Sequence, residues 1–395
     1  MSEILVNTIK KADGTGSITV PAETGTVVTT AAGSVEGAMT TQIGGRRNLI
    51  INGAQIISQR QTSKTNFSNG DFVTDRWQHF TNGFGSSGTV VDGEQVPDAP
   101  DGFKKSMKIT VTTAGGLDSA DNYGALGQKF EHQNISQFLD SDSVTVSFYV
   151  KSSLATTYAV ILERRNVNTG TTGDVYVANY TINSANTWER KTITIPTNST
   201  QASGDDNAYG ATLIFVQDLK SGGSRDDASL GWNNSTTTIQ INSAATDNGF
   251  FDSANTWQIT GVQLEVGSVA TPFEHRSYGE ELNLCRRYLI QTEHYGSSTT
   301  ARLYTSSTGS VTSTNSWVLL NIQLPNEMRA TPSIKYSDVA GNIDKLSLWT
   351  STGGGMSDNV APHTDYADKN SFTISEYYSA KMGVIIGGYK AEAEL

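Results

Sequence analysis

The feature that most constrains this chain is a two-residue alternation of apolar and polar side chains along its middle part. Apolar residues take every second position in residues 107–112, 144–151 and 192–195, and Ile239 and Ile241 repeat the pattern. Successive side chains of a β-strand point to opposite faces, so the alternation predicts antiparallel strands with one buried and one solvated face. Thr and Ser, rather than charged residues, fill most of the outward positions.

Turn-forming clusters separate these runs at residues 166–173, 198–206 and 220–227. Hydrophobic residues make up 36% of the 395 residues and charged residues 17%, against ~45–50% and ~25% in an average globular chain. The 15 Tyr, 13 Phe and 6 Trp still supply large side chains for hydrophobic cores. Short strands between such turns predict an all-β chain with a sandwich or barrel architecture.

One strand carries a more local prediction. Trp257 and Ile259 lie on one face, whereas the apolar positions from Val262 onward fall on the opposite parity. The change of phase occurs at Gly261. A phase change at a glycine predicts a β-bulge, which would bring both apolar sets to one core.

The one convincing helix signal covers residues 280–289. Two glutamates begin this segment and two arginines lie near its end, as the helix dipole prefers. Leu282, Cys285 and Leu289 fall on one helical stripe. Cys285 is therefore expected to be a small buried hydrophobic residue rather than a catalytic thiol.

A second β-rich unit follows the helix. Pro325, Gly341, Pro362 and three successive glycines at 353–355 interrupt it, and no fixed repeat supports a solenoid or propeller. The predicted strands are residues 288–293, 300–305, 316–324, 333–337, 346–350, 371–375 and 382–386.

Composition excludes several classes of protein. The formal net charge is −11, and the absence of a Lys/Arg cluster argues against nucleic-acid binding. No apolar run approaches the length of a membrane span, and the first residues lack the apolar region of a signal peptide. Because Cys285 is the only cysteine, an intrachain disulfide and a Cys-based zinc site are excluded. We expect synthesis in a cytoplasm.

Residues 1–47 differ from the rest because they contain no aromatic side chain. Such a segment buries too little apolar surface to fold alone. Two interpretations remain open, a disordered tail and an extended segment ordered by other copies or by a larger assembly. Recurring Val and Ile, as in residues 17–20 and 26–30, favour the second interpretation.

Three stretches carry a family resemblance. The first is NLIINGAQIISQRQTS, residues 48–63, followed by Asp75-Arg76-Trp77; the second is residues 257–288; the third is LPNEMRATPSI, residues 324–334, with the end of the chain at 391–395. Together they resemble the tail-fibre and receptor-binding proteins of tailed bacteriophages, including marine and cyanobacterial phages.

The resemblance implies an organisation. It implies a virion-attachment and oligomerisation segment at residues 1–47, extended in form, and a jelly-roll β-sandwich like a carbohydrate-binding module at residues 48–277. A short linking helix and a smaller C-terminal β-sandwich tip domain would occupy residues 278–395. It also implies a homotrimer in the virion, attached through residues 1–47 to tail, baseplate or head proteins. Weak, Ser/Thr/Gly-rich units agree with trimer formation, since packing of copies would bury their remaining apolar residues.

The residues do not suggest an enzyme. None of the five His lies in a recognisable motif, and the sequence has no GxSxG, HExxH or P-loop pattern. The acidic pairs 205–206 and 226–227 lie in turns, and adjacent strand residues point to opposite faces. They are therefore poor candidates for the paired carboxylates of glycan hydrolysis.

Sugar binding is the functional class that we predict instead. Sugar sites need aromatic platforms beside Asp, Asn and Arg side chains. For Trp232 and Trp349, a position in the hydrophobic core is the alternative to a role in ligand binding. The remaining tryptophans, at 77, 188, 257 and 317, are interpreted as core residues. The predicted ligand-binding residues are Trp232, Asn233, Arg225 and Asp226 in one cluster, and Trp349, His363 and Tyr366 in another.

No cofactor or metal site is predicted. Jelly-rolls of this type often hold a structural calcium ion, for which Asp75, Asp92 and Glu265 offer oxygen ligands. The sequence contains no DxDxDG-like loop, so calcium remains a possibility without an assigned site.

The sequence thus favours a non-enzymatic virion fibre protein that attaches to host cells by binding a surface glycan. The alternative is a structural or head-attached fibre without receptor contact. A polysaccharide depolymerase is the third hypothesis.

Overall fold

The computed structural model describes residues 8–10, 17–19, 47–139, 141–166, 172–196, 204–234, 239–298, 303–306, 316–350, 356–361, 364–378 and 381–395. The chain divides into two compact units, Met1–Arg46 and Arg47–Leu395. In the first unit, β1 (Thr8–Lys10) pairs antiparallel with β2 (Ser17–Thr19). The β-prone run at residues 26–30 lies outside the described residues.

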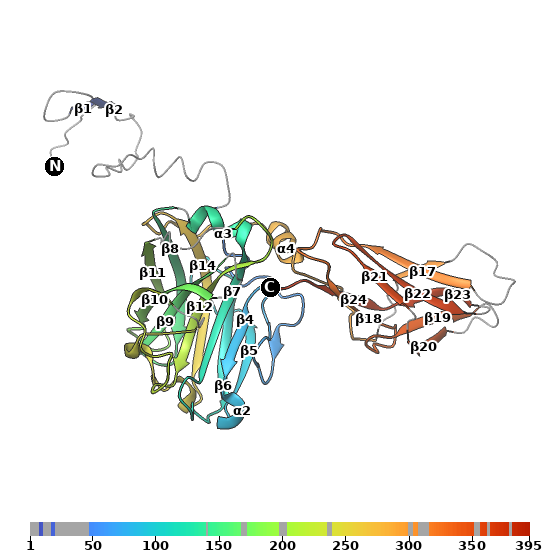
Figure 1. The fold of residues 1–395 in the computed structure, drawn as a ribbon, viewed down its shortest axis with the longest axis horizontal. Coiled ribbons are helices and arrows are strands. Elements are labelled where there is room, and N and C mark those ends of the chain that lie inside the picture. The colour runs from blue at the N-terminus through green and yellow to red at the C-terminus, as the bar shows by residue number, and fades with distance from the viewer. Residues whose placement is uncertain are drawn as a thin grey trace. The chain divides into compact units, whose positions relative to one another are not determined.

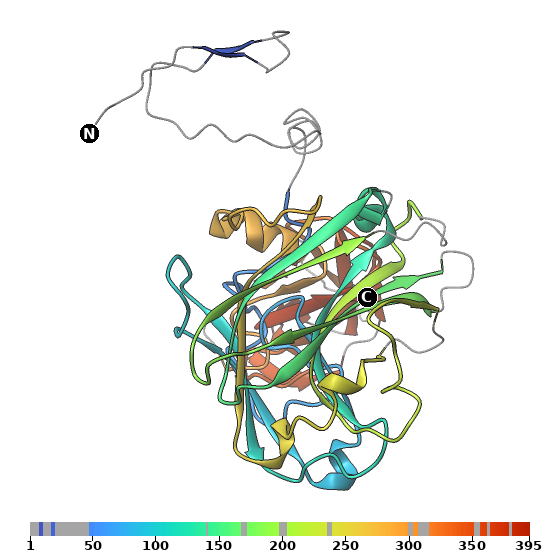
Figure 2. The ribbon, with the colours of Figure 1, turned by 90° about the vertical axis from the view of Figure 1, so that its left-hand side faces the viewer.

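The second unit begins with a β-sandwich of two six-stranded antiparallel sheets, as predicted (Figure 1). The first sheet has the order β13-β10-β9-β12-β7-β4, and the second has the order β11-β8-β14-β6-β5-β3. Figure 2 shows the same strands from a second direction. The first sheet contains β4 (Gln78–Asn82), β7 (Tyr123–Glu131), β9 (Thr157–Arg165), β10 (Thr172–Thr181), β12 (Tyr209–Leu219) and β13 (Gly231–Asn234). The second contains β3 (Ser63–Lys64), β5 (Val90–Val96), β6 (Ser106–Thr113), β8 (Ser143–Ser152), β11 (Glu189–Pro196) and β14 (Thr256–Val266).

The core between the two sheets follows the alternation in the sequence. Met107, Ile109 and Val111 of β6 are buried, and so are the apolar residues of β8 at every second position. Trp77 and Trp257 are fully buried in the same cluster. Their core interpretation is therefore confirmed.

The predicted bulge in β14 is also confirmed. The pairing of β14 with β8 shifts register between Thr260 and Gln263, and Gly261 has φ +61°. Ile259 before the shift and Val262 after it both lie in the core. A Cβ atom at residue 261 would lie 2.6 Å from Cζ of Phe103, so the position requires glycine for space as well as for φ.

The prediction of a strand at Ile239 and Ile241 is wrong. This segment forms no ladder, apart from an isolated bridge between Asp227 and Asn242. Both isoleucines are nevertheless buried, in a separate cluster with Ile161 on the outer face of the first sheet. The alternation thus shows that these side chains pack against a sheet, and it does not show that their backbone forms part of that sheet.

The helix prediction is confirmed by α4 (Tyr278–Arg286), but it extended too far, because Leu289 begins the strand β15 (Leu289–Gln291). The Ser277 hydroxyl accepts a hydrogen bond from the Glu280 amide and caps the helix, and Cys285 is fully buried. Four short helical segments were not predicted: α2 (Phe84–Ser87), α3 (His132–Leu139), η1 (Ser243–Ala245) and η2 (Phe250–Asp252). Among the described residues, no helix is long and apolar enough to cross a membrane.

A smaller all-β part of the second unit follows α4 and has its own core around Phe372, Ile374 and Tyr336; we call it the distal domain because it comes later in the sequence. Seven of its strands match the predicted ones, while β20, β21 and β24 were not predicted. Its strands form three sheets. The first contains β15 (Leu289–Gln291), β24 (Gly388–Glu392) and β18 (Ser333–Ser337), and the second contains β16 (Leu303–Ser306), β23 (Lys381–Ile386), β19 (Leu346–Thr350) and β20 (Met356–Val360). The third contains β17 (Ser316–Gln323), β22 (Ser371–Tyr378) and β21 (Thr364–Ala367).

Candidate functional site

Trp232, the aromatic residue of the first predicted sugar cluster, lies on the edge strand β13. Its half-buried ring packs edge-on against Tyr176, with 5.4 Å between ring centroids. Its indole N–H donates to the Pro196 carbonyl at 2.6 Å. Trp232 therefore packs at the edge of the sandwich core, and its ligand-binding role stays a prediction.

The polar members of this cluster serve the local backbone. Asn233 donates its amide N–H groups to the carbonyls of Ser229 and Gly231. Asp226 accepts the Gly222 amide at 2.7 Å. These bonds hold the loop before β13.

Arg225 lies elsewhere on the first sheet. It donates to the Ile239 carbonyl at 2.9 Å, and its guanidinium lies 5.5 Å from the Tyr123 ring centroid on β7. Since β9 and β12 separate β7 from the β10 strand that contacts Trp232, these contacts do not bring Arg225 and Trp232 together.

The second predicted cluster is described only in part. Tyr366 lies on β21, where 68% of its surface is exposed. Trp349 is on β19, opposite Met356 and Gly383, but its side chain lies outside the description, as does all of His363. Of the side chains described in this cluster, the exposed Tyr366 ring is available for a stacking contact.

The three potential calcium ligands do not converge. Asp75 accepts hydrogen bonds from Gln59, Asp92 accepts the Asn66 amide, and Glu265 accepts from Thr271. In the described part of the chain, no three His, Cys, Asp or Glu side chains are grouped to hold a metal ion.

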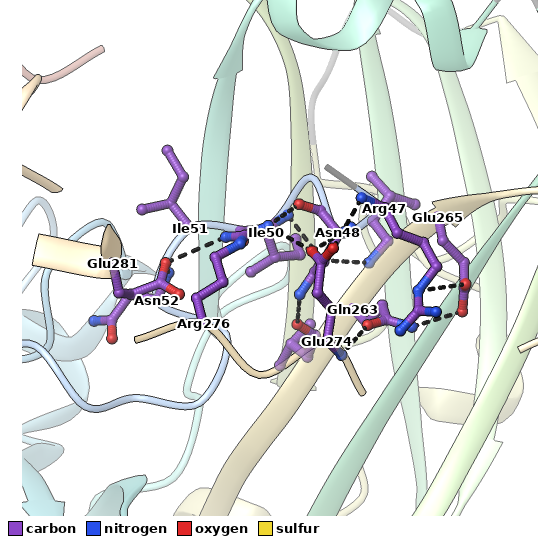
Figure 3. Close-up of polar contacts among 12 residues, drawn as sticks. Arg47, Asn48, Ile50, Ile51, Asn52, Gln263, Glu265, Glu274, Arg276 and Glu281 are labelled. Atoms are coloured by element: carbon purple, nitrogen blue, oxygen red, sulfur yellow. Dashed lines mark hydrogen bonds and ion pairs between the residues drawn. The ribbon is translucent and has the colours of Figure 1, made fainter. Parts of the chain in front are cut away.

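A buried polar network, which the sequence did not predict, begins at the bulge in β14. Pairing of β14 with β6 ends at Ile259, before the bulge, and the side chain of Asn48, labelled in Figure 3, binds backbone groups of β14 beyond it. Its amide donates to the Val262 carbonyl at 3.1 Å, and its oxygen accepts the Leu264 amide at 3.1 Å. The Val262 amide donates to the carbonyl of Gly53. Two of the three stretches that carry the resemblance thus meet at one structural irregularity.

Charged side chains surround Asn48 and its partners Val262 and Leu264, which we call the bulge site. Arg276 lies between Glu274, at 3.1 Å, and Glu281, at 3.3 Å (Figure 3). Glu274 also accepts the backbone amides of Arg47 and Asn48, while Glu281 accepts that of Asn52 at 2.6 Å. Burial opposes ionisation of Glu274, but these amides and Arg276 outweigh it and hold its pKa below the usual value.

A second group of charges joins the sandwich to the distal domain, and we call it the interdomain junction. Glu131, at the end of β7, is fully buried and accepts two hydrogen bonds from Arg287, at 2.7 and 2.6 Å. The Tyr288 hydroxyl donates to the same carboxylate at 2.5 Å. Burial raises the pKa of Glu131, but these bonds outweigh burial and leave the pKa below its usual value.

The end of the chain completes the interdomain junction. Arg60 binds Glu392 at 2.6 Å and Glu394 at 3.2 Å, and Arg76 also pairs with Glu394. The Arg76 guanidinium lies 3.4 Å from the Tyr288 ring centroid. Arg329 of the third stretch donates to the carbonyls of residues 393 and 394. All three resemblance stretches therefore contribute to the contact between the two domains.

Removing one partner of a buried ion pair destabilises a fold by roughly 3–5 kcal/mol, because the other charge stays buried. The interdomain junction therefore opposes hinge motion between sandwich and distal domain. The resemblance stretches were the one signal in the sequence that pointed to these residues. The partners lie too far apart along the chain to be paired from sequence: 332 residues separate Arg60 from Glu392.

No protein-family model and no curated protein matches the chain. Solved structures similar to it include the enzymatically active domain of tailspike protein 4 of bacteriophage CBA120, at 15% identity and a TM-score of 0.29, covering 56% of this chain and 21% of that chain. The family 11 carbohydrate-binding module of Clostridium thermocellum matches at 13% identity and a TM-score of 0.28, covering 53% and 99%. The CBM22-1-CBM22-2 tandem domain of Paenibacillus barcinonensis Xyn10C matches at 11% identity and a TM-score of 0.25, covering 86% and 92%. Values this low assign neither a family nor a ligand.

Proposed function

We propose that the chain is a non-enzymatic fibre protein of a phage virion, which attaches through residues 1–47 and carries a rigid pair of β-domains that bind host-surface glycan. The observation that carries this proposal is that all three resemblance stretches contribute residues to the interdomain junction. The stretches that resemble phage fibre proteins support the proposal because their residues join one β-domain to the other. A fibre needs such coupling to hold its outer part in a defined direction.

A complementation experiment tests the fibre role. A phage that lacks its own copy of this chain is grown in cells that supply either the full chain or residues 47–395, which form a compact unit with its own cores. We expect the full chain to enter particles and restore adsorption, and residues 47–395 to fail to enter particles. Normal adsorption by particles that lack the chain would overturn the host-attachment role.

Glycan binding is tested on the purified full chain. We expect binding to host-surface polysaccharide on a glycan array without release of reducing sugar. Trp232→Ala and Tyr366→Ala test the two clusters predicted from the sequence, and light scattering tests the proposed trimer. Release of sugar that is lost on mutation of one carboxylate would instead indicate a depolymerase.

The alternative function is a structural fibre without receptor contact. The interdomain junction supports this alternative equally, because rigid coupling serves assembly as well as adhesion. Particles that require the chain for assembly, yet adsorb normally after its glycan-binding residues are changed, would support the structural role.

A further inference from the structure

The outer face of the second sheet carries an aromatic and basic surface. Strand register places Lys108 of β6 beside Gln258 of β14, and Gln258 beside Lys151 of β8. Trp188 immediately precedes Glu189, the residue of β11 that pairs with Val150 of β8. Since Val150 faces the core, Lys151 and its neighbours in this row face outward.

Trp188 is not the core residue that its strand position predicts. It is half-buried and belongs to none of the three hydrophobic clusters that the described residues form. Its indole N–H donates to Asp98 at 3.2 Å, and the Lys151 ammonium lies 5.3 Å from its ring centroid while pairing with the same Asp98. The ring is thus held at the surface by polar contacts beside a cation.

The next row repeats this combination. Tyr149, two positions along β8 from Lys151, pairs with Arg190 of β11 and is half-buried. Its ring lies 5.3 Å from that of Phe103, centroid to centroid. Arg190 donates to the Thr271 carbonyl at 2.8 Å. Two aromatic rings and two cations therefore alternate across adjacent strands.

Two loops border this surface. The first lies against β14, where the Thr260 hydroxyl donates to the Lys105 carbonyl at 2.8 Å. The second lies over the opposite end of β8, where Thr145 donates to the Gly267 carbonyl at 2.6 Å. The surface between them, which we call the β8 face, consists of Lys108, Lys151, Trp188, Tyr149 and Arg190 with Asp98.

The sign of the local charge is opposite to that of the chain. The full sequence has a net charge of −11, whereas three of the four charged residues of the β8 face are basic. Ion pairs among the described residues engage Lys151 but neither Lys108 nor Arg190. The basic residues of the β8 face are Lys108, Lys151 and Arg190, and its acidic residue is Asp98; Glu94 of β5 pairs in register with Lys108 at one edge.

We propose that the β8 face binds an acidic polysaccharide; this inference rests on the proposed glycan-binding function. Aromatic rings contact the apolar faces of sugar rings, and the neighbouring cations bind their carboxylate, sulfate or phosphate substituents. The Asp98 carboxylate accepts hydrogen bonds from sugar hydroxyl groups. A nucleic acid fits less well, because its binding uses a basic groove that follows the phosphate backbone, whereas the β8 face offers three cations beside one carboxylate.

Affinity electrophoresis of the full chain tests the proposal. The gels contain polygalacturonate, polysialate, a sulfated galactan, a neutral glucan or single-stranded DNA. We expect retardation by at least one acidic polysaccharide. Trp188→Ala and Lys108→Glu should each weaken that retardation roughly tenfold, the loss expected for one stacking or charge-assisted contact.

Matched controls separate the site from general effects. Phe80→Ala removes a half-buried aromatic ring of the first sheet that belongs to neither predicted sugar cluster, and Lys335→Glu changes the charge at an exposed position of the distal domain. We expect both to bind as the unchanged protein does. Melting temperatures of all variants verify folding, and Trp188→Phe, which keeps a ring, should retain most binding.

The outcomes distinguish this inference from the proposed function. Binding to neutral glucan alone, or binding that Trp232→Ala abolishes and Trp188→Ala does not, overturns the β8 face but keeps the glycan-binding function. Preferential binding of DNA overturns the inference as well. Failure of the full chain to bind any polysaccharide in the gels or on the host-glycan array removes both.

Discussion

The interdomain junction and the β8 face use the same residue types in opposite ways. At the junction, Glu131, Arg287 and Tyr288 bind one another, and the carboxylate is fully buried. On the β8 face, Arg190 lies beside the half-buried Tyr149 and Lys108 lies on β6, and neither has an ion pair among the described residues. Charges that satisfy one another fix the fold, whereas charges left at the surface beside rings are available to a ligand.

The largest expected effect comes from Glu131→Ala. It leaves the Arg287 guanidinium and the Tyr288 hydroxyl without their shared acceptor. We expect the free energy of unfolding to fall by about 3–5 kcal/mol, measured by denaturant unfolding of the full chain.

The comparison variant removes an exposed ion pair. Lys335 and Asp344 lie 3.9 Å apart, and about half of each side chain is exposed. Lys335→Ala should change stability by less than about 1 kcal/mol. Equal losses in Glu131→Ala and Lys335→Ala would contradict the role assigned to the interdomain junction.

The second prediction concerns the bulge site. Asn48→Ala removes the side-chain bonds to Val262 and Leu264, and leaves these buried backbone groups without partners. We expect a loss of about 2–3 kcal/mol in the free energy of unfolding. Asn48→Asp keeps the acceptor but not the donor, so it should give an intermediate loss above neutral pH. Full stability of Asn48→Ala would mean that water replaces the side chain.

The third prediction concerns the pH dependence of stability, to which His79 and Glu131 contribute in different pH ranges. Burial lowers the pKa of His79, which is stacked on Phe67, to about 3. The unfolded chain takes up this proton below its ordinary pKa of about 6.5, and the folded chain does so only near 3. Stability from neutral His79 is therefore complete above pH 6.5 and falls as the pH drops toward 3, by up to about 1.4 kcal/mol per pH unit.

His79→Phe should remove this part of the pH dependence in unfolding experiments between pH 4 and 7. The pKa of Glu131 is held below its usual value, so the stability it supplies is present above the ordinary carboxyl pKa and is lost at still lower pH. If the unfolding free energy of His79→Phe still changes with pH between 4 and 7 as that of the unchanged protein does, groups other than His79 cause the change.

The smallest expected effect on stability is that of Trp188→Ala. Trp188 lies outside the hydrophobic clusters, so we expect a loss below about 1 kcal/mol, within the range of surface substitutions that leave cores intact. Trp257→Ala, at a fully buried position, should cost about 3–5 kcal/mol. A large loss in Trp188→Ala would show that the ring is structural and would weaken the assignment of the β8 face.

The local sequence pattern was sufficient to predict those strands, bulges and helices that depend on residues close together in the chain. The alternation in residues 107–112 became β6, the phase change at Gly261 became a bulge, and the acidic start of α4 became a capped helix. Ile239 and Ile241 show the limit of this reasoning. A period of two records which side chains are buried, and it does not show whether backbone hydrogen bonds join a sheet.

The candidate sites depended on contacts that no local pattern encodes. Trp188 directly precedes the strand β11, where the sequence predicted a core residue, yet Asp98 and Lys151 hold its ring at the surface. Arg225 and Trp232 are close in sequence, but their contacts lead to different strands. Such placement is decided by which strands become neighbours, and this was accessible only from the fold.

The bond between Asn48 and Leu264 spans 216 residues. A chain emerging from the ribosome must therefore expose residues 48–52 for most of its synthesis before their partners in β14 exist. Closing so long a loop carries an entropic cost that local contacts cannot offset in advance, so the sandwich should form late and in one cooperative step. Until then, the apolar NLIING segment is a natural target for chaperones, and its exposure time should set how much of the protein is recovered in soluble form.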